Sequence, residues 1–214
     1  MGTHWNWRLA SRLSVITLAV LVVLTVALLQ QRNHTATPAI DSSSSATSSA
    51  LQGSDLGRTP APNFTLTDQA GKQISLAQFK GSPVILTFLY TNCPDQCPLT
   101  AEKLHSTIQM LGQNAQHVSI IAVSTDPKRD TTAAALNFSK AHNMQDYWHY
   151  LVGSRQSLGS VWASYHIFAQ PQQQTVNHSL GIYLIDKQGR ERTFMDSDFT
   201  PSQLTANLNT LLKE

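Results

Sequence analysis

The run PVILTFLY at residues 83–90 leads directly into TNCPDQCPLT at residues 91–100, and this stretch decides the fold. Its first part is a continuous apolar, β-rich segment, as expected of a strand that is buried on both faces of a sheet. Its second part opens a helical pattern with Pro98 in the first turn, where a proline is well tolerated. Cys93 and Cys97 therefore lie where a buried strand ends and a helix begins.

These two cysteines are the only ones among the 214 residues, and a proline follows each. One turn of helix would separate their α-carbons by about 6 Å, which suits a disulfide or a soft metal ion held by two thiolates. A structural disulfide is common in exported proteins, but a loop this short would restrict the unfolded chain little. We therefore favour a functional pair, and the spacing leaves open a redox couple and a metal site.

The composition excludes several classes of protein. Apolar residues make up 41% of the chain, which is enough for a core, while 2 cysteines are too few for a disulfide scaffold. The net charge is only +2, and lysine and arginine are scattered singly, so we expect no nucleic-acid partner. The length allows one sizeable domain with appendages, or two small domains.

The N-terminal part predicts a membrane anchor followed by a tether. Residues 13–29 read LSVITLAVLVVLTVALL and carry no charge. We interpret residues 13–30 as a transmembrane helix rather than a cleaved signal peptide, because no suitable cleavage site follows the run. More arginines precede the run than follow it, which places residues 1–12 in the cytoplasm and exports the rest. Residues 31–58 are rich in serine and indicate a flexible tether.

Residues 59–214 predict an α/β domain. The expected strands are a hairpin over 63–76, buried strands over 81–91 and 117–125, a short strand over 150–152, and closing strands over 179–185 and 191–194. The expected helices are 98–111, 131–142, 154–165 and 201–212, with Asp130 or Thr131 as the cap of the second. A polar loop is expected over 171–174. Alternating strands and helices indicate a sandwich with a central mixed sheet.

A metal site built on two thiolates needs a third ligand, and Cu(I) accepts imidazole beside thiolate sulfur. Most of the eight histidines fall in the N-terminal segments or read as surface and packing residues: His4, His34, His105, His117, His142, His149 and His166. His178 differs, because it stands where the polar loop meets a strand. Spacing alone leaves open whether His178 is a ligand.

Motifs over residues 60–212 resemble the SCO/SenC family in residue type and order. They are Asn63-Phe64-x-Leu66-x-Asp68-x-x-Gly71, Phe79-Lys80-Gly81, Tyr90-Thr91-x-Cys93-Pro94-x-x-Cys97-Pro98, Ser124-x-Asp126-Pro127-x-Arg129-Asp130-Thr131 and His178-Ser179-x-x-x-Tyr183-Leu184-Ile185-Asp186. The resemblance implies a membrane-anchored copper protein with a thioredoxin-like fold and an N-terminal β-hairpin extension. It also implies assistance in assembling the Cu(A) centre of cytochrome c oxidase.

The same resemblance implies a site. Cys93, Cys97 and His178 would bind copper, as Cu(I) or Cu(II), in a shallow, exposed site, and Asp126 would lie near it without being a ligand. Asn177 stands where the family commonly has aspartate, which could weaken the orientation of the histidine. Gln96 likewise replaces a common valine.

The implied activity is that of a metallochaperone at the cytoplasmic membrane, with its domain in the periplasm. Its partners would be cytochrome c oxidase subunit II or another cuproprotein acceptor, or a second periplasmic copper chaperone. An alternative is a thiol–disulfide oxidoreductase in which Cys93 and Cys97 reduce the acceptor's cysteines. A peroxidase is a weaker alternative, because Thr91 stands two residues before Cys93 rather than three. A redox or copper sensor without transfer activity also stays open.

Overall fold

The computed structural model describes residues 21, 23–27, 51–173 and 175–214. The chain divides into two compact units, Met1–Ser48 and Ser49–Glu214. Most of the anchor expected over residues 13–30 lies outside the described residues, as does the tether up to residue 50. Within the described ranges, no helix has both the length and the hydropathy that a membrane crossing requires.

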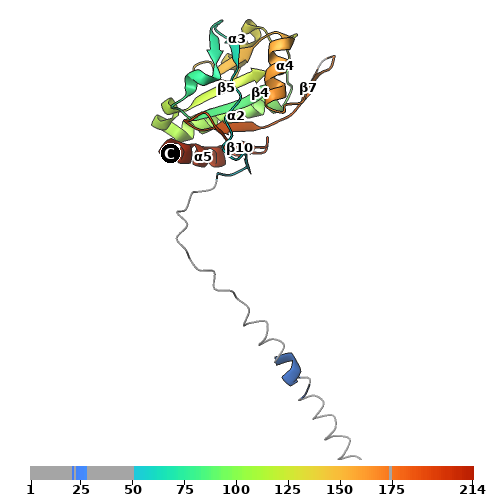
Figure 1. The fold of residues 1–214 in the computed structure, drawn as a ribbon. Helices are drawn as coiled ribbons and strands as arrows, with labels where there is room; N and C mark the ends of the chain where they lie inside the picture. The colour runs from blue at the N-terminus through green and yellow to red at the C-terminus, as the bar shows by residue number, and fades with distance from the viewer. Residues whose placement is uncertain (1–20, 22, 28–50, 174) are drawn as a thin grey trace, which may run out of the picture. The chain divides into compact units, whose positions relative to one another are not determined.

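The second unit is built on a mixed sheet, seen between the helices in Figure 1. Its strands are β1 (Ser54–Asp55), β2 (Thr65–Asp68), β3 (Gln73–Ser75), β4 (Val84–Leu89), β5 (Ser119–Ser124), β6 (His149–Val152), β9 (Ile182–Ile185) and β10 (Glu191–Met195). In the described residues the strand order is β1-β10-β9-β4-β5-β6-β2-β3. The pairs β4–β5 and β5–β6 are parallel, whereas β4 pairs β9 in the antiparallel sense, which confirms the mixed sheet.

The two central strands are buried on both faces, as their continuous apolar sequences predict. Along β4, Ile85 and Leu89 belong to one apolar cluster, while Leu86 and Phe88 belong to another. Successive side chains of a strand point to opposite faces, so the two clusters lie on the two sides of the sheet. The core of the unit is therefore complete within Ser49–Glu214, and this unit is expected to fold on its own.

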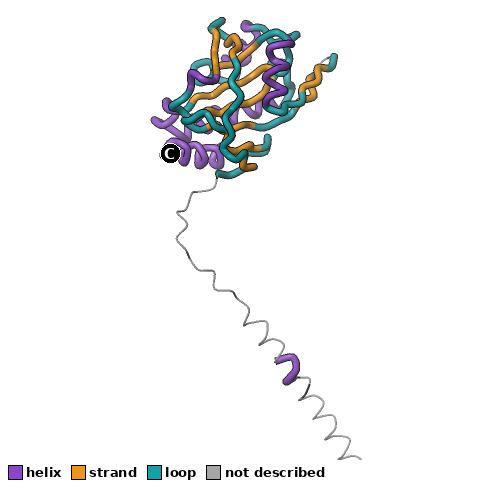
Figure 2. The backbone as a smooth tube through the Cα atoms, viewed as in Figure 1, coloured by secondary structure: helices purple, strands orange, loops and turns teal. Residues whose placement is uncertain are grey.

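Helices cover both faces of the sheet (Figure 2). They are α2 (Gln96–Leu111), α3 (Thr132–Ala141), α4 (Arg155–Ser164) and α5 (Pro201–Lys213), with short 3-10 segments η1 (Leu76–Phe79) and η2 (Gly112–His117). Side chains of α2, α3 and α5 enter the first cluster, and those of α4 enter the second beside the β2–β3 hairpin. The hydroxyls of Thr131, Ser154 and Thr200 cap α3, α4 and α5 by accepting backbone N–H bonds.

The two edges of the sheet are formed by the most N-terminal strands of this unit. The β2–β3 hairpin pairs with β6, in agreement with the expected hairpin extension. At the other edge β1 pairs with β10, and the Gln52 N–H donates to Asn207 Oδ1 at 2.8 Å. The folded unit therefore includes residues 51–58, which the sequence analysis assigned to the tether. These contacts are made mainly by backbone groups, so the sequence of residues 51–58 shows no periodic apolar pattern.

A second, two-stranded sheet carries the last histidine of the chain. Strand β7 (Ala169–Pro171) pairs with β8 (Val176–His178), and Figure 1 shows β7 projecting from the domain. The sequence analysis instead expected a loop over 171–174 and one strand over 179–185. The strand starts later, at Ile182, because Gly181 adopts a φ of 140° that breaks the extended run. Only glycine fits there, since a Cβ would lie 2.6 Å from the Met195 carbonyl oxygen.

Candidate metal centre

The corner after β4 brings both cysteines under the start of α2. The Cys93 N–H donates to the carbonyl oxygen of Tyr90 at 3.3 Å, which turns the chain back toward the sheet. Asp95 caps α2 by accepting from the Gln96 N–H. The helix therefore begins two residues before the expected Pro98 and includes Cys97 in its first turn, so this side chain points into the core.

Both sulfurs are free thiols and both are buried, with Cys93 9% exposed and Cys97 0% exposed. The expectation of a shallow, exposed site was wrong in this respect, because the early start of α2 turns Cys97 inward. The Cys97 N–H donates to Cys93 Sγ at 3.3 Å, so the helix N-terminus stabilises negative charge on that sulfur.

The two cysteines differ strongly in acidity. A hydrogen bond from the Cys97 thiol lowers the pKa of Cys93 to about 5, opposed by burial and assisted by the backbone N–H groups of Cys97 and Asp95. The same bond, together with burial, raises the pKa of Cys97 far above its ordinary value. Near neutral pH the corner therefore holds one thiolate, at Cys93, and one thiol, at Cys97.

The structure places His178 against this pair. Its Nε2 lies 4.0 Å from Cys97 Sγ, and its ring packs edge-to-face on Tyr90 with 5.6 Å between centroids. Nδ1 lies 2.7 Å from the carbonyl oxygen of Ser179, so Nδ1 carries the proton and donates it. Burial lowers the pKa of His178, which favours the neutral ring. The lone pair of Nε2 is thus free toward the sulfur, as a metal ligand requires.

The three predicted ligands lie near one another without forming a ready-made site. Within the described part of the chain, no group of three or more His, Cys, Asp and Glu side chains is assembled closely enough to hold a metal ion. Metal bonds of ~2.3 Å to sulfur and ~2.0 Å to nitrogen would bring the two ligand atoms about 3.6–3.8 Å apart. The His178–Cys97 separation is close to this, so a bound ion needs small adjustments of the corner.

Asp126 lies at the carboxyl end of β5, beside the corner, in a buried position with 1% exposure. Its Oδ2 forms an ion pair with Arg129, and its Oδ1 has no hydrogen-bond partner among the described residues. Thr131, rather than Asp126, caps the following helix. The hydrogen bonds of the described residues do not join Asp126 to either cysteine or to His178.

Asp130 is a site residue that the sequence analysis named as a possible helix cap and as part of a family motif, without giving it a role at the site. This buried carboxylate accepts from the Thr91 N–H at 3.0 Å, from the Thr91 hydroxyl at 2.7 Å and from Ser124 Oγ at 2.6 Å. It also accepts from the Tyr150 hydroxyl at 3.2 Å. Burial raises the pKa of Asp130. The signal in the sequence was an acidic residue in the connection between β5 and α3, directly before the helix cap Thr131.

The remaining described histidines make contacts elsewhere. His105 packs on Tyr147, His142 on Phe138, and His149 pairs with Asp68 at 3.1 Å. His117 ends η2, and His166 lies after α4 with a φ of 53°. His4 and His34 fall outside the described residues.

This chain is similar to known proteins over a region that includes all three predicted ligands. The profile of the SCO1/SenC family matches residues 53–213. A SCO2-like protein of Rickettsia prowazekii is 29% identical over 134 residues, which cover 59% of this chain and 64% of that protein. The mitochondrial SCO2 homolog of Bos taurus is 30% identical over 154 residues, which cover 67% of this chain and 56% of that protein. The chain spans less than two thirds of the length of these relatives.

Solved structures of related proteins have a similar fold. ScoI of Bradyrhizobium japonicum with copper bound is 31% identical with a TM-score of 0.66, over 72% of this chain and 100% of that chain. ScoI of Arabidopsis thaliana with copper bound is 26% identical with a TM-score of 0.66, over 73% of this chain and 100% of that chain. The family profile spans the cysteine corner, Asp126 and His178 together. The chain belongs to the SCO1/SenC family.

Proposed function

We propose that this chain is a membrane-tethered, copper-binding metallochaperone that assists assembly of the Cu(A) centre of cytochrome c oxidase. The observation that carries the proposal is His178 Nε2 at 4.0 Å from Cys97 Sγ, while the Cys97 N–H donates to Cys93 Sγ. Copper bound to two related ScoI proteins supports the choice of metal. BsSco, which shares the fold, is described as belonging to the Sco family of cytochrome c oxidase assembly proteins, and this supports the proposed role.

Copper is cargo in this proposal. Two thiolates and an imidazole form a soft donor set that suits Cu(I), and the neutral ring of His178 also suits Cu(II). Cys93 offers a thiolate at once, whereas Cys97 must give up its proton as the metal binds. Cys93 is the more exposed residue of the pair, so an acceptor thiolate would reach it first and exchange ligands there. Oxidation of the pair would remove both sulfur ligands.

The proposed setting is the periplasmic face of the cytoplasmic membrane. The charge-free run within residues 13–30 would anchor the chain, with residues 1–12 in the cytoplasm, and the serine-rich segment after it would tether the folded unit. The proposed acceptor is cytochrome c oxidase subunit II or another cuproprotein, with a second periplasmic copper chaperone as a further partner.

Anaerobic copper titration of the unit Ser49–Glu214 tests the metal site. We expect one Cu(I) per reduced chain and none held by the oxidised pair. Cys93→Ser and Cys97→Ser should each abolish stoichiometric Cu(I) binding, and His178→Ala should weaken Cu(II) binding more than Cu(I) binding. His142→Ala, a histidine that packs on Phe138, is the matched control and should bind as the wild type does. Tight copper binding by the double cysteine variant would refute the proposal.

A thiol–disulfide oxidoreductase is the second candidate, because a low-pKa thiolate beside a protonated thiol suits attack on a disulfide. This activity needs Cys93 and Cys97 but not His178. Reduction of a disulfide-containing peptide from the acceptor's metal site by wild type and His178→Ala separates the two functions. Oxidase assembly at the wild-type level with His178→Ala would favour the oxidoreductase, and its loss would favour copper delivery.

A further inference from the structure

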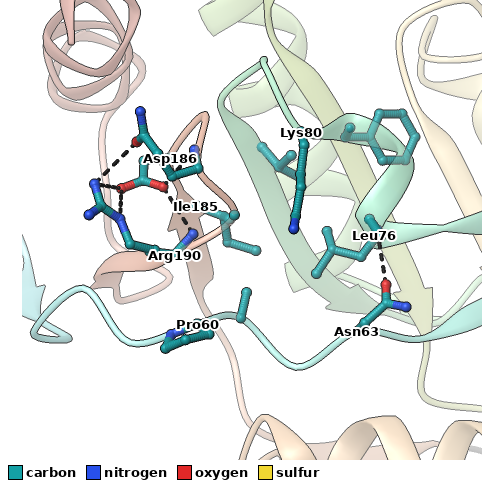
Figure 3. A pocket seen from close by; sticks show the side chains of 13 residues that line it. Pro60, Asn63, Leu76, Lys80, Ile185, Asp186 and Arg190 are labelled. Carbon is teal, nitrogen blue, oxygen red and sulfur yellow. Dashed lines mark hydrogen bonds and ion pairs between the residues drawn. The ribbon is translucent and has the colours of Figure 1, made fainter.

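A cavity lies at the start of β4, away from the cysteine corner, and Figure 3 shows it from close by. It has a volume of about 440 Å³ and is bordered by Val84 at the start of β4 and Ile185 at the end of β9. The cysteines follow the other end of β4. This volume is in the range of ~300–1,000 Å³ that small-molecule sites occupy. The proposed copper function does not use this cavity.

Most of the cavity wall is apolar. The apolar side chains come from three segments, the chain before β2, the η1 turn and the paired strands: Pro60, Ala61, Leu76, Ala77, Phe79, Val84 and Ile185. Leu76, Val84 and Ile185 are themselves buried, so they form a fixed floor that belongs to the core. Such a floor favours an alkyl or similar apolar group over a polar ligand.

Two cations stand at the cavity. Figure 3 shows the Lys80 side chain reaching between Leu76 and Ile185, with Arg190 on the other side of Ile185. The Lys80 ammonium has no hydrogen bond or ion pair to any described residue. The acidic lining residue, Asp186, is already satisfied by the backbone N–H groups of Gln188 and Arg190 and by the Arg190 and Arg192 side chains. Because Arg190 is itself paired with Asp186, the Lys80 ammonium is the positive charge that the cavity offers to a ligand, and little negative charge opposes it.

Few backbone N–H groups around the cavity are free to form hydrogen bonds with a bound peptide. The Ala61 N–H donates to the Gly189 carbonyl oxygen, the Gly189 N–H to Asp186 and the Gly81 N–H to Lys187. The Ala77 N–H is taken by Asn63 Oδ1 at 2.9 Å. A peptide strand binds chiefly through main-chain hydrogen bonds, which these groups cannot supply. A single alkyl chain needs none of them.

We propose that this cavity binds a single-chain anionic amphiphile, with its alkyl chain on the floor of Leu76, Val84 and Ile185 and its carboxylate at the Lys80 ammonium. The proposal goes beyond the copper function and does not depend on it. Its two requirements, an apolar tail and a negative head, are separately testable.

Octanoate is the probe for this proposal, titrated into the reduced unit Ser49–Glu214 and followed by amide chemical shifts. Octanoate should shift the amides of Ala77, Gly81 and Gly189, whereas acetate, which lacks the tail, and 1-octanol, which lacks the charge, should bind at least about threefold more weakly. Lys80→Gln should weaken octanoate about threefold or more, within the range expected for one partly exposed ion pair. Ala77→Phe should block the alkyl chain.

Lys72→Gln is the matched control, because Lys72 is an exposed lysine outside this cavity and should leave octanoate binding unchanged. Copper titration of Lys80→Gln should give the wild-type result, so loss of the amphiphile site cannot be mistaken for loss of the metal site. Absence of shifts at these amides, equal binding of 1-octanol, or equal effects of Lys72→Gln and Lys80→Gln would each overturn the proposal.

Discussion

Cys93 and Cys97 share one corner and one hydrogen bond, yet this bond moves their acidities in opposite directions. The thiol of Cys97 donates to the sulfur of Cys93 and so stabilises a thiolate there, while the presence of that thiolate makes ionisation of Cys97 costly. One proton is therefore shared unequally by the pair. The Cys93 thiolate can act as a nucleophile. It is also one of the two thiolates that the proposed copper site needs.

Replacing Cys97 tests which group lowers the pKa of Cys93. Cys97→Ala removes the donor, so the thiolate of Cys93 should form at a pH above the wild-type midpoint of about 5, though the Cys97 backbone N–H still helps to lower it. Cys97→Ser keeps a hydroxyl donor, so the pKa of Cys93 should stay lower in this variant than in Cys97→Ala. Ultraviolet thiolate absorbance against pH measures both midpoints. Equal midpoints in the alanine and serine variants would rule out the side-chain bond as the main cause.

The same protonation states predict how copper binding depends on pH. Near neutral pH Cys93 is a thiolate and His178 is neutral, while Cys97 still carries its proton. Cu(I) binding should therefore release about one proton, and the apparent affinity should rise about tenfold for each pH unit. Below a pH of about 5 the dependence should steepen, because Cys93 is then protonated as well.

Calorimetric titration in two buffers of different ionisation enthalpy counts the protons directly. Release of none, or of two, would contradict the unequal sharing of the proton between the sulfurs.

Among the secondary-structure elements, the connection between β5 and α3 holds the cysteine corner in place. Asp130, just before α3, binds the Thr91 backbone and hydroxyl two residues from Cys93, and reaches Ser124 at the end of β5 and Tyr150 on β6. One carboxylate thus ties together the carboxyl ends of β4 and β5 and a side chain of β6. The corner owes its position to this connection as well as to the start of α2.

Asp130→Ala should destabilise the unit by roughly 2–4 kcal/mol, because it leaves several buried donors without an acceptor. Asp130→Asn should cost less, since burial already raises the pKa of this carboxyl and a neutral amide keeps one acceptor oxygen. Urea unfolding measures both variants. Asp198→Ala, at an exposed position, is the control and should change the free energy of unfolding by no more than about 0.5 kcal/mol. A cost for Asp130→Ala as small as that of the control would exclude a clamping role.

The β7–β8 hairpin shows why the site could not be completed from the sequence. His178 was singled out by its place after a polar loop, and the family motif made it a candidate ligand. The pairing of Ala169 with His178 was missed, because this hairpin is polar and buries little apart from Val176. No alternating apolar pattern marks it, so tertiary contacts decide its register. The same holds for Asp130, whose partners lie on three different elements.

In the whole molecule, the sheet separates two ends with different chemistry. The carboxyl ends of β4 and β5 carry the cysteine corner, and the opposite end of β4 carries the cavity beside Lys80 and Arg190. The central strands and their two-sided burial could be predicted from continuous apolar runs, because such runs have one stable placement in a covered sheet. The beginning of the folded unit could not, because the segment before residue 59 is fixed by polar contacts to distant residues.

Comparison of Ser49–Glu214 with a chain that starts at Thr59 tests this boundary. The Gln52 backbone exchanges two bonds with the Asn207 side chain, at 2.8 and 2.9 Å, and its carbonyl also accepts from the Thr193 hydroxyl at 3.1 Å. Removal of residues 49–58 should therefore lower the free energy of unfolding by roughly 1–3 kcal/mol, given about 1 kcal/mol for each hydrogen bond.

Asn207→Ala in the longer chain should reproduce part of this loss, whereas in the shorter chain, where Gln52 is already absent, it should cost less. The difference between the two costs measures the coupling between the segment around Gln52 and α5. Equal stability of the two chains would mean that residues 51–58 belong to the tether and that β1 does not contribute to the free energy of unfolding.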